Sequence, residues 1–354
     1  MKYYKQNDKS VQDLRAQARA TREIASASED GDAQELAFDG AATLDSIASK
    51  REAKEPPGTI AFLPYTASMT ELSEMRQRRS VLHGQSIYLP VWRNDSIVFP
   101  NLLLRSSLFS SSNPGPMLKN EPIAVQGDAS IIMTGPQLCD YDRRVLAVCI
   151  KHYRDQKLAD ATGPKWIETT FWKFAKDLGV SYGAQVHKAI QSSLIRLSEV
   201  VLRVRLERYD LQVGRLIEVS LESSSEENFR PRGGGEIVFR IFDSMAKLYG
   251  LAKWTAVSEK ALHNYSGLAS WIVSFYSTHS KPYPITMGNL YKLSGSKGEM
   301  FAFRRRLKQA LSKLQNSDVP DNIRISRVDI DGEKVVVYLA RWSKIIEKVE
   351  SDKN

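Results

Sequence analysis

The sequence contains few of the residues that metal binding and catalysis require. Its 354 residues include only two cysteines and five histidines. The histidines form no His-x-His or His-x-x-x-His pair for a metal, and none stands beside a plausible Ser or Cys nucleophile. They are His83, His152, His187, His263 and His279. We therefore expect no metal, no cofactor and no enzymatic activity.

The motifs that come closest to a catalytic site are incomplete. Gly233–Gly235 lacks the Lys-Ser or Lys-Thr pair of a phosphate-binding loop and does not open a helix after a strand, which favours a hinge. Tyr265 lies near His263, as the nucleophile of a rolling-circle nicking enzyme lies near histidines, but it falls in the apolar pattern of a helix. Cys139 and Cys149 are ten positions apart in one predicted helix, too far along its axis to form a disulfide. We expect all these residues to be structural.

Long apolar runs are absent as well. No run approaches the roughly 20 residues of a membrane span. The segment Met1–Asp8 also lacks the apolar core of a signal peptide. We therefore expect a cytoplasmic protein without a membrane segment. With 42% hydrophobic residues, the chain can bury the cores of about two or three domains.

Negative charge is in short supply. The chain has 50 Lys and Arg residues against 41 Asp and Glu residues, a formal net charge of +9. Such an excess favours an acidic partner, and DNA, RNA and anionic membrane surfaces all fit it. The patterns along the chain distinguish among these partners.

A basic amphipathic helix is predicted at Lys297–Leu314. Its apolar positions form one stripe suited to a core, namely Phe303, Leu307, Ala310, Leu311 and Leu314. The opposite face carries Phe301, Arg305, Lys308, Gln309 and Ser312, flanked by Arg304, Arg306 and Lys313. This face suits a DNA major groove, because Arg and Gln bond base edges bidentately, cations bind phosphates, and an apolar side chain contacts a thymine methyl. The alternative is an ordinary solvated helix face.

A β-hairpin is predicted directly after this helix. The β-rich runs Ile323–Ile330 and Glu333–Ala340 are joined by Asp331-Gly332, a pair that suits a type I′ turn. A short helix, a basic helix and a hairpin in this order are typical of a winged helix. Arg327 and Lys334 of the hairpin complete the predicted DNA-binding set of this region.

The same order of elements occurs earlier in the chain. A short helix at Phe171–Leu178 precedes a helix that opens at Ser181. The runs Val200–Leu206 and Arg215–Leu221 are then predicted to pair as a hairpin. The predicted buried stripe of the second helix is Val186, Ile190, Leu194 and Leu197. Its predicted DNA-binding residues, rich in side chains that read bases, are Ser181, Gln185, Lys188, Gln191, Ser192 and Arg196.

The two copies are offset by about 115 residues, the scale of tandem domains. We therefore expect an α+β protein with two tandem winged-helix domains, whose reading helices reach successive major grooves of one duplex. The polar N-terminal region buries little and is predicted to be a flexible, partly helical arm. The predicted parts are the arm (1–84), winged-helix domain 1 (85–222), a Ser- and Gly-rich linker (223–235), winged-helix domain 2 (236–345) and a tail (346–354).

Several segments resemble those of the TrfA-type plasmid replication initiators, relatives of the iteron-binding Rep proteins with tandem winged helices. The similar segments, within residues 85–345, are Trp92 with Leu104–Phe109, Met133–Leu138, Lys176–Gly179, Gln191–Leu197 and Ser277–Pro284. The resemblance implies a protein that binds directly repeated sites, or iterons, in a plasmid origin as duplex DNA and helps to melt adjacent AT-rich DNA. It also implies recruitment of the host replication initiator and the replicative helicase.

The resemblance further implies two protein contacts. Such proteins commonly dimerise through the first winged domain, here through the hairpin Ile123–Thr134, for which the alternative is an ordinary packed hairpin. The residues concerned are Ile123, Val125, Ile131 and Met133. Some relatives carry a short peptide that docks in the host sliding clamp. Loose matches, of a kind that arises by chance, are Gln34–Phe38 and Gln85–Leu89, the latter with Gln85, Tyr88 and Leu89.

Two other functions fit parts of this pattern. A transcriptional repressor with the same two domains differs from an initiator in that binding alone, without melting of the DNA, explains its effect. An RNA-binding or scaffolding protein would show no preference for a repeated duplex site.

Overall fold

The computed structural model describes residues 16, 18–23, 87–93, 95–206, 209–221, 235–251 and 253–341. The chain divides into two compact units, Met1–Ile60 and Ala61–Asn354, which are treated separately. In the first unit, residues 18–23 are helical, within the stretch predicted to form helix. Most of the predicted arm, Gln34–Phe38, Gln85 and the tail lie outside the described residues.

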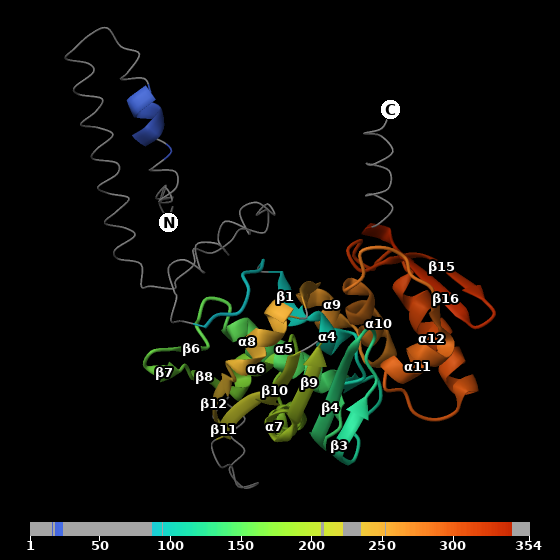
Figure 1. Ribbon diagram of the computed structural model, residues 1–354, viewed down its shortest axis with the longest axis horizontal. Helices are drawn as coiled ribbons and strands as arrows, with labels where there is room; N and C mark the ends of the chain where they lie inside the picture. The colour runs from blue at the N-terminus through green and yellow to red at the C-terminus, as the bar shows by residue number, and fades with distance from the viewer. Residues whose placement is uncertain are drawn as a thin grey trace. The chain divides into compact units, whose positions relative to one another are not determined.

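The second unit is a mixed α/β fold with several small sheets (Figure 1). Its described helices are α4 (Asn101–Leu104), α5 (Asp140–His152), α6 (Phe171–Asp177), α7 (Ala184–Glu199), α8 (Ser244–Leu251), α9 (Glu259–Asn264), α10 (Gly267–Ser277), α11 (Met287–Leu293) and α12 (Met300–Leu314). Its longer strands are β1 (Ser96–Pro100), β3 (Met117–Ile123), β4 (Ala129–Pro136), β8 (Ile167–Thr170), β9 (Val201–Leu206), β10 (Tyr209–Arg215), β11 (Ile217–Leu221), β12 (Glu236–Ile241), β13 (Trp254–Ser258), β15 (Ile325–Asp331) and β16 (Lys334–Leu339). The two-residue strands are β2 (Phe109–Ser110), β5 (Leu138–Cys139), β6 (Ala159–Asp160), β7 (Gly163–Pro164) and β14 (Ile285–Thr286).

Two three-stranded sheets share one topology. In the first, β8 precedes α6 and α7 and pairs with β12, which also pairs with β11. In the second, β14 precedes α11 and α12 and pairs with β16, which also pairs with β15. Both runs therefore contain a strand, a short helix, a long helix and a final antiparallel pair of strands, with the first strand beside the last, but in the first run β9 and β10 intervene between α7 and β11.

The hairpin predicted after α7 pairs differently from the expectation. The run Val200–Leu206 pairs as β9 with β10 and with β4, in a sheet of order β10-β9-β4-β3. The run Arg215–Leu221 contributes β11, which pairs with β12 instead. Strand β10 was not predicted from the sequence, because Asp210 and Gly214 are poor strand formers. Val213 is nevertheless buried on the inner face of this strand.

The segment predicted as a linker, 223–235, lies outside the described residues except for Gly235, and the strands on its two sides pair with each other. Leu221 at the end of β11 is opposite Ile237 near the start of β12. Ile237, Phe239 and Ile241 alternate along β12 and are at most 1% exposed in the first core. Val257 and Leu262 also belong to the first core, whereas Ala261 belongs to the second, so the change between the two cores falls near Leu262.

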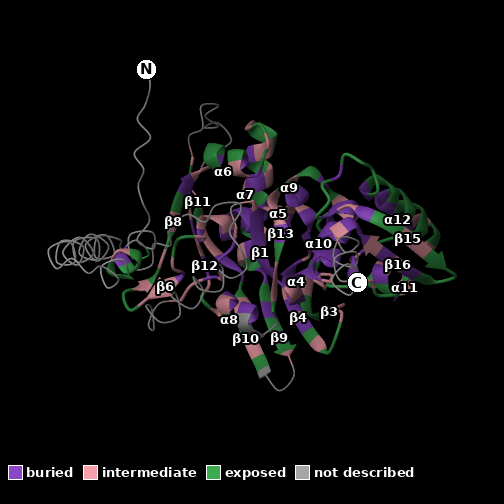
Figure 2. Cartoon of the chain, turned by 90° about the horizontal axis from the view of Figure 1, so that it is seen from above, coloured by how far each residue is buried: buried purple, intermediate pink, exposed green. Residues whose placement is uncertain are grey.

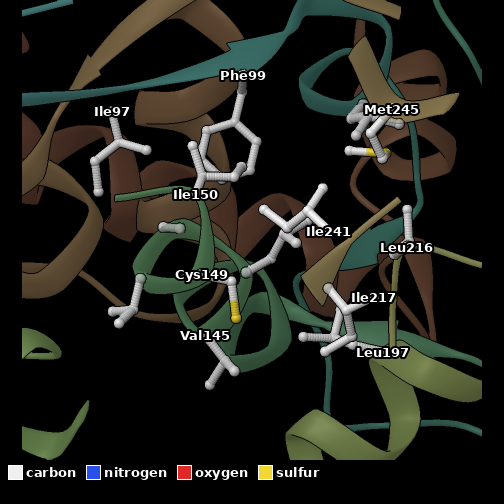
Figure 3. Close-up of a cluster of buried hydrophobic side chains, with 14 of the residues drawn as sticks. Ile97, Phe99, Val145, Cys149, Ile150, Leu197, Leu216, Ile217, Ile241 and Met245 are labelled. Atoms are coloured by element: carbon white, nitrogen blue, oxygen red, sulfur yellow. The ribbon is translucent and has the colours of Figure 1, made fainter. Parts of the chain in front are cut away.

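The first core is built around α5. Figure 3 shows Ile97 and Phe99 of β1, Cys149 of α5, Ile241 of β12 and Met245 of α8 in this cluster. Helix α5 confirms the helix predicted around Cys149, although Cys139 is its N-cap and lies just before its first residue. Both thiols are buried and free, and burial raises the pKa of Cys139 to about 11.

The second core is built around α10 and α12. The stripe predicted from the sequence is confirmed, since Phe303, Leu307, Ala310, Leu311 and Leu314 are all buried. Tyr265 is also in this core, as predicted. The helix in which the sequence pattern placed Tyr265 is interrupted there, because Tyr265 is extended and Gly267 has a positive φ of 58°.

Candidate nucleic-acid interface

The outer face of α12 is where the sequence placed the main DNA-binding residues. The apolar stripe of the helix packs inward and sets the rotation of α12, so the opposite face points to solvent. Figure 2 shows exposed positions along α12. The side chains predicted for this face are all exposed, namely Phe301, Arg304, Arg305, Arg306, Lys308, Gln309, Ser312 and Lys313. Phe301 is 80% exposed, which leaves its ring free to contact a partner.

The charge of this face is one-sided. The segment Met300–Leu314 contains five Arg and Lys residues and no Asp or Glu. Arg306 donates through Nη2 to the backbone O of Lys297 (2.9 Å), and the Lys313 ammonium lies 5.7 Å from the centroid of the Tyr265 ring. The helix therefore carries a positive charge that an acidic polymer can neutralise.

The β15–β16 hairpin is less cationic than the sequence analysis assumed. Arg327 pairs with Asp329 (2.8 Å) and its guanidinium lies 4.2 Å from the centroid of the Tyr338 ring, while Lys334 is exposed. Exposed acids flank the turn, at Asp331 and Glu333. The hairpin tip therefore repels phosphates as well as attracting them.

Glu333 was missed by the sequence analysis, although the Asp331-Gly332-Glu333 turn contained the signal. Its carboxylate pairs with the guanidinium of Arg304 on α12. Both side chains are well exposed, at 59% and 44%, so water and salt screen the pair. Arg304 must leave Glu333, or share it, before it binds a phosphate.

Replacing Glu333 with Gln is expected to tighten DNA binding by about 1 kcal/mol, roughly fivefold, because it frees Arg304 and removes a charge that repels phosphates. Anisotropy titrations at two salt concentrations measure the change, which should shrink at high salt. Asp318→Asn is the matched control, since it removes an exposed acid in the loop after α12. An equal gain in both variants would show that only net charge matters, and not the release of Arg304.

The face of α7 is polar but smaller than predicted. The helix begins at Ala184 with Gly183 as N-cap, so Ser181 is exposed in the preceding loop and not on the helix. Gln185, Lys188 and Ser192 are exposed, and Gln191 is half-buried. The predicted inner stripe is confirmed at three positions, Ile190, Leu194 and Leu197, while Val186 is half-buried.

Arg196 does not belong to this exposed face. Its guanidinium binds the fully buried carboxylate of Asp142 on α5, with Nη2 2.7 Å from Oδ1 and Nε 3.2 Å from Oδ2. The side chain of Arg196 is only 20% exposed. The prediction that Arg196 binds DNA is corrected for this reason, because a DNA contact would leave the Asp142 charge buried and without its cation.

His187 is a further feature of α7 that the helical pattern did not reveal. It is buried, its ring is stacked on Phe171 with centroids 3.8 Å apart, and its Nδ1 is 3.0 Å from the Tyr182 hydroxyl. Burial lowers the pKa of His187 and favours the neutral ring. These contacts tie α7 to α6 and hold the exposed face in place.

The hairpin proposed for dimerisation is present as β3 and β4, but its residues do not form a common surface. Ile131 and Met133 are 0% and 1% exposed in the first core, so neither side chain is available to a second chain. Ile123 and Val125 are half-buried against the same core. The physical reason is the two-residue period of β4, which turns Ile131 and Met133 inward.

The segment proposed for the sliding clamp is built into the fold where it is described. Ile87 donates its backbone N–H to Ala159 O (2.9 Å), and Leu158 donates its own to Ile87 O (2.7 Å). Leu89 is 1% exposed in the first core, and Tyr88 is half-buried. A clamp-binding peptide must present its apolar residues to a partner, so the placement of Leu89 does not fit that role.

Two observations concern other kinds of site. Within the described ranges, no helix combines the length and apolar character needed to cross a membrane. The same part of the chain contains no group of three or more His, Cys, Asp or Glu side chains that could hold a metal ion.

Comparison with known proteins adds to this geometry. The sequence matches the family model described as TrfA protein over residues 70–333. No curated protein matches it. A crystal structure of selenomethionine derivatives of domains 2 and 3 of RctB is similar with a TM-score of 0.44 at 9% identity, covering 68% of this chain and 97% of that chain. A second structure, RctB domains 2–3 (RctB-155-483), gives a TM-score of 0.41 at 11% identity, with coverage of 68% and 97%.

Proposed function

The chain belongs to the TrfA family of plasmid replication initiators, and we propose that it starts replication by binding repeated sites in the origin as duplex DNA. The observation that supports this most is the outer face of α12, which is exposed, free of acidic residues and equipped with both Arg and Gln. A merely solvated helix face has no need of five cations without one carboxylate.

We propose that the two runs with shared topology are winged-helix modules. The first module comprises β8, α6, α7, β11 and β12, and the second comprises β14, α11, α12, β15 and β16. The strand orders β11-β12-β8 and β14-β16-β15 support this reading, because a winged helix pairs its first strand with the last strand of its wing. On this reading the strands β11 and β12 form the wing of the first module, and the change between modules falls near Leu262.

Within the second module, we assign base reading to Arg305 and Gln309 and phosphate binding to Lys308 and Lys313. Arg bonds guanine and Gln bonds adenine through two hydrogen bonds each, whereas Lys provides a point charge for phosphates. Phe301 would contact a thymine methyl. Gln185, Lys188, Gln191 and Ser192 would serve the first module in the same way, as a mainly polar set. The proposal includes no catalytic step and no cofactor.

The later steps of initiation, DNA opening and recruitment of host proteins, are proposed from the family membership and not from a particular contact in this structure. Binding of several copies to repeated sites would bend and unwind the adjacent AT-rich DNA, which is the DNA that opens most easily. The protein bound at the repeated sites would then recruit the host replication initiator and the replicative helicase.

A footprint over the plasmid origin, combined with permanganate reactivity of unpaired thymines, tests the proposal. We expect protected repeats at low protein concentration and reactive thymines beside them at higher concentration. A DNA fragment with shuffled repeats is the control and should show neither signal. Protection without reactive thymines would favour a transcriptional repressor, and equal protection of shuffled DNA would contradict sequence-specific binding altogether.

A further inference from the structure

Two helices from different cores, α5 and α10, are joined by a buried polar cluster. Helix α10 packs on α12 within the second core and on α4 and α5 of the first (Figure 1). Arg143 of α5 lies at this contact. Its Nη2 donates to Asp140 Oδ1 and to Ser270 Oγ, and its Nη1 donates to Ser274 Oγ and to the backbone O of Ser270 (3.3 Å). These four residues are called the Arg143 cluster below.

The Arg143 cluster lies beside the point where the chain passes from one core to the other. Asp140 uses its second oxygen, Oδ2, to accept a hydrogen bond from the backbone N–H of Gly267 (3.3 Å) at the start of α10. Helix α9 ends at Asn264, just before this point. One carboxylate therefore orients both Arg143 and the first turn of α10.

Stability alone does not account for a charged group at this position. Arg143 is 2% exposed, and Ser270 and Ser274 are 0% and 1% exposed. Removing a guanidinium from water is costly, and well-packed apolar residues often stabilise such a site equally well. A planar guanidinium does offer fixed bond directions, so one relative placement of α5 and α10 satisfies both of its Nη donors, while Nε has no partner among the described residues.

Further contacts between the two cores are also polar and directional. Arg105, which follows α4, donates to Thr278 Oγ1 (2.7 Å) and to Thr278 O at the C-terminal end of α10. Ser110 donates through Oγ to Gly295 O (2.7 Å), in the turn that leads into α12. Among the described residues of the second unit, the buried hydrophobic side chains form two clusters, and Ala124 of the first half also packs against the second of them. Orientation therefore depends on hydrogen bonds more than on a shared apolar core.

We propose that Arg143 is a positioning residue that fixes the angle and separation of α7 and α12, and thereby the spacing of the DNA sites that the protein accepts. The proposal rests on the proposed function, because it takes both helices to read one duplex. Arg143 acts through its neighbours: α5 packs on α7, and α10 packs on α12. When one helix is bound, the other binds its own DNA site more tightly only if both helices can reach their sites at the same time. A fixed angle between α7 and α12 therefore selects one spacing of the two DNA sites.

A distance measurement tests the positioning role without DNA. Spin labels on Ser192→Cys of α7 and Ser312→Cys of α12 report the separation of the two helices by electron–electron double resonance. The two native cysteines are buried, which limits their reaction with the label. We expect a narrow distance distribution for the otherwise unchanged protein and a broadened or displaced one for Arg143→Met. An unchanged distribution would overturn the proposal.

Two further variants keep this measurement decisive. Ser270→Ala with Ser274→Ala removes the acceptors on α10 while Arg143 stays, so it carries the test if Arg143→Met does not fold. Arg240→Met is the matched control, because it also removes a guanidinium (21% exposed) that binds a carboxylate, that of Glu218, but within the first core and on neither labelled helix. Broadening in the control as well would assign the effect to general loosening and would count against a specific role for Arg143.

Binding to spaced sites links this role to specificity. For the unaltered protein we expect the natural spacing to bind about 10²-fold tighter than the same sites separated by about five extra base pairs, half a helical turn. Arg143→Met should reduce this preference to within about threefold and leave single-site affinity unchanged. If Arg143→Met lost the same affinity for the natural spacing, the altered spacing and a single site, the positioning role would be overturned. If the unaltered protein shows no spacing preference, the proposed function fails, and the distance measurement still decides the role of Arg143.

Discussion

Replacing Asp142 with Ala is expected to lower the free energy of unfolding by about 3 to 5 kcal/mol, the usual result of removing one partner from a buried ion pair. The carboxylate is fully buried and accepts hydrogen bonds from Cys139 N (2.8 Å), Ser193 Oγ (2.6 Å) and Arg196 Nη2 (2.7 Å). The substitution removes the acceptor at the start of α5 and leaves the Arg196 charge without its partner. Because Arg196 is 20% exposed and can regain some water, the lower end of the range is favoured.

Urea unfolding followed by circular dichroism measures this effect. Asp210→Ala is the matched control, since Asp210 is 62% exposed and its oxygen lies 3.4 Å from Arg205. Exposed pairs of this kind contribute about 1 kcal/mol at most, so the control should barely move the midpoint. Similar losses in the two variants would mean that Asp142 is not a central tie between α5 and α7.

The elements whose role is set by local periodicity could be predicted from the sequence. The apolar stripe of α12 repeats at helical spacing, and that spacing alone places Arg305 and Lys308 on the exposed side. The Asp331-Gly332 pair likewise predicted a hairpin at the right place, but the type I′ turn is wrong: Asp331 ends β15 opposite Lys334, and of the two loop residues, Gly332 and Glu333, only Gly332 has a positive φ (55°), the pattern of a type II′ turn. Both predictions depend only on residues close in the sequence.

Partners distant in the sequence could not be predicted in this way. The strand pattern of β11 suits β9 and β12 equally well, and only the packing of the whole sheet selects β12. Arg196 has the spacing of an exposed helix residue, yet Asp142, 54 positions earlier, draws it inward. The serines of α10 looked neutral in the sequence, and their role in binding Arg143 required the α5–α10 contact to be known.

This distinction matters for the DNA-binding assignment, which depends on both kinds of information. The side chains of α12 are exposed because of a local pattern, and no distant residue covers them in the described part of the chain. Arg304 is the member of that set whose availability depends on a distant residue, Glu333. Arg305 and Gln309 are therefore the better choice for a test of base reading.

Arg305→Ala together with Gln309→Ala is expected to weaken binding to the cognate repeat by about 2 to 6 kcal/mol, since each bidentate contact to a base contributes about 1 to 3 kcal/mol. This corresponds to a loss of roughly 30-fold to more than 10⁴-fold in affinity. Both residues are exposed on the outer face of α12, so the change should leave the thermal unfolding midpoint nearly unaltered. Anisotropy titration against the cognate repeat and against a shuffled duplex measures the effect.

The comparison between the two duplexes separates base reading from simple loss of charge. The double variant should lose much more affinity for the cognate repeat than for shuffled DNA, because base contacts carry the sequence preference. Lys313→Ala removes a cation from the same helix and serves as the control. It should weaken both duplexes to the same extent and reduce the salt dependence of binding by about one counterion. If the double variant also loses affinity equally on both duplexes, α12 contacts the backbone alone, and sequence recognition must lie elsewhere in the chain.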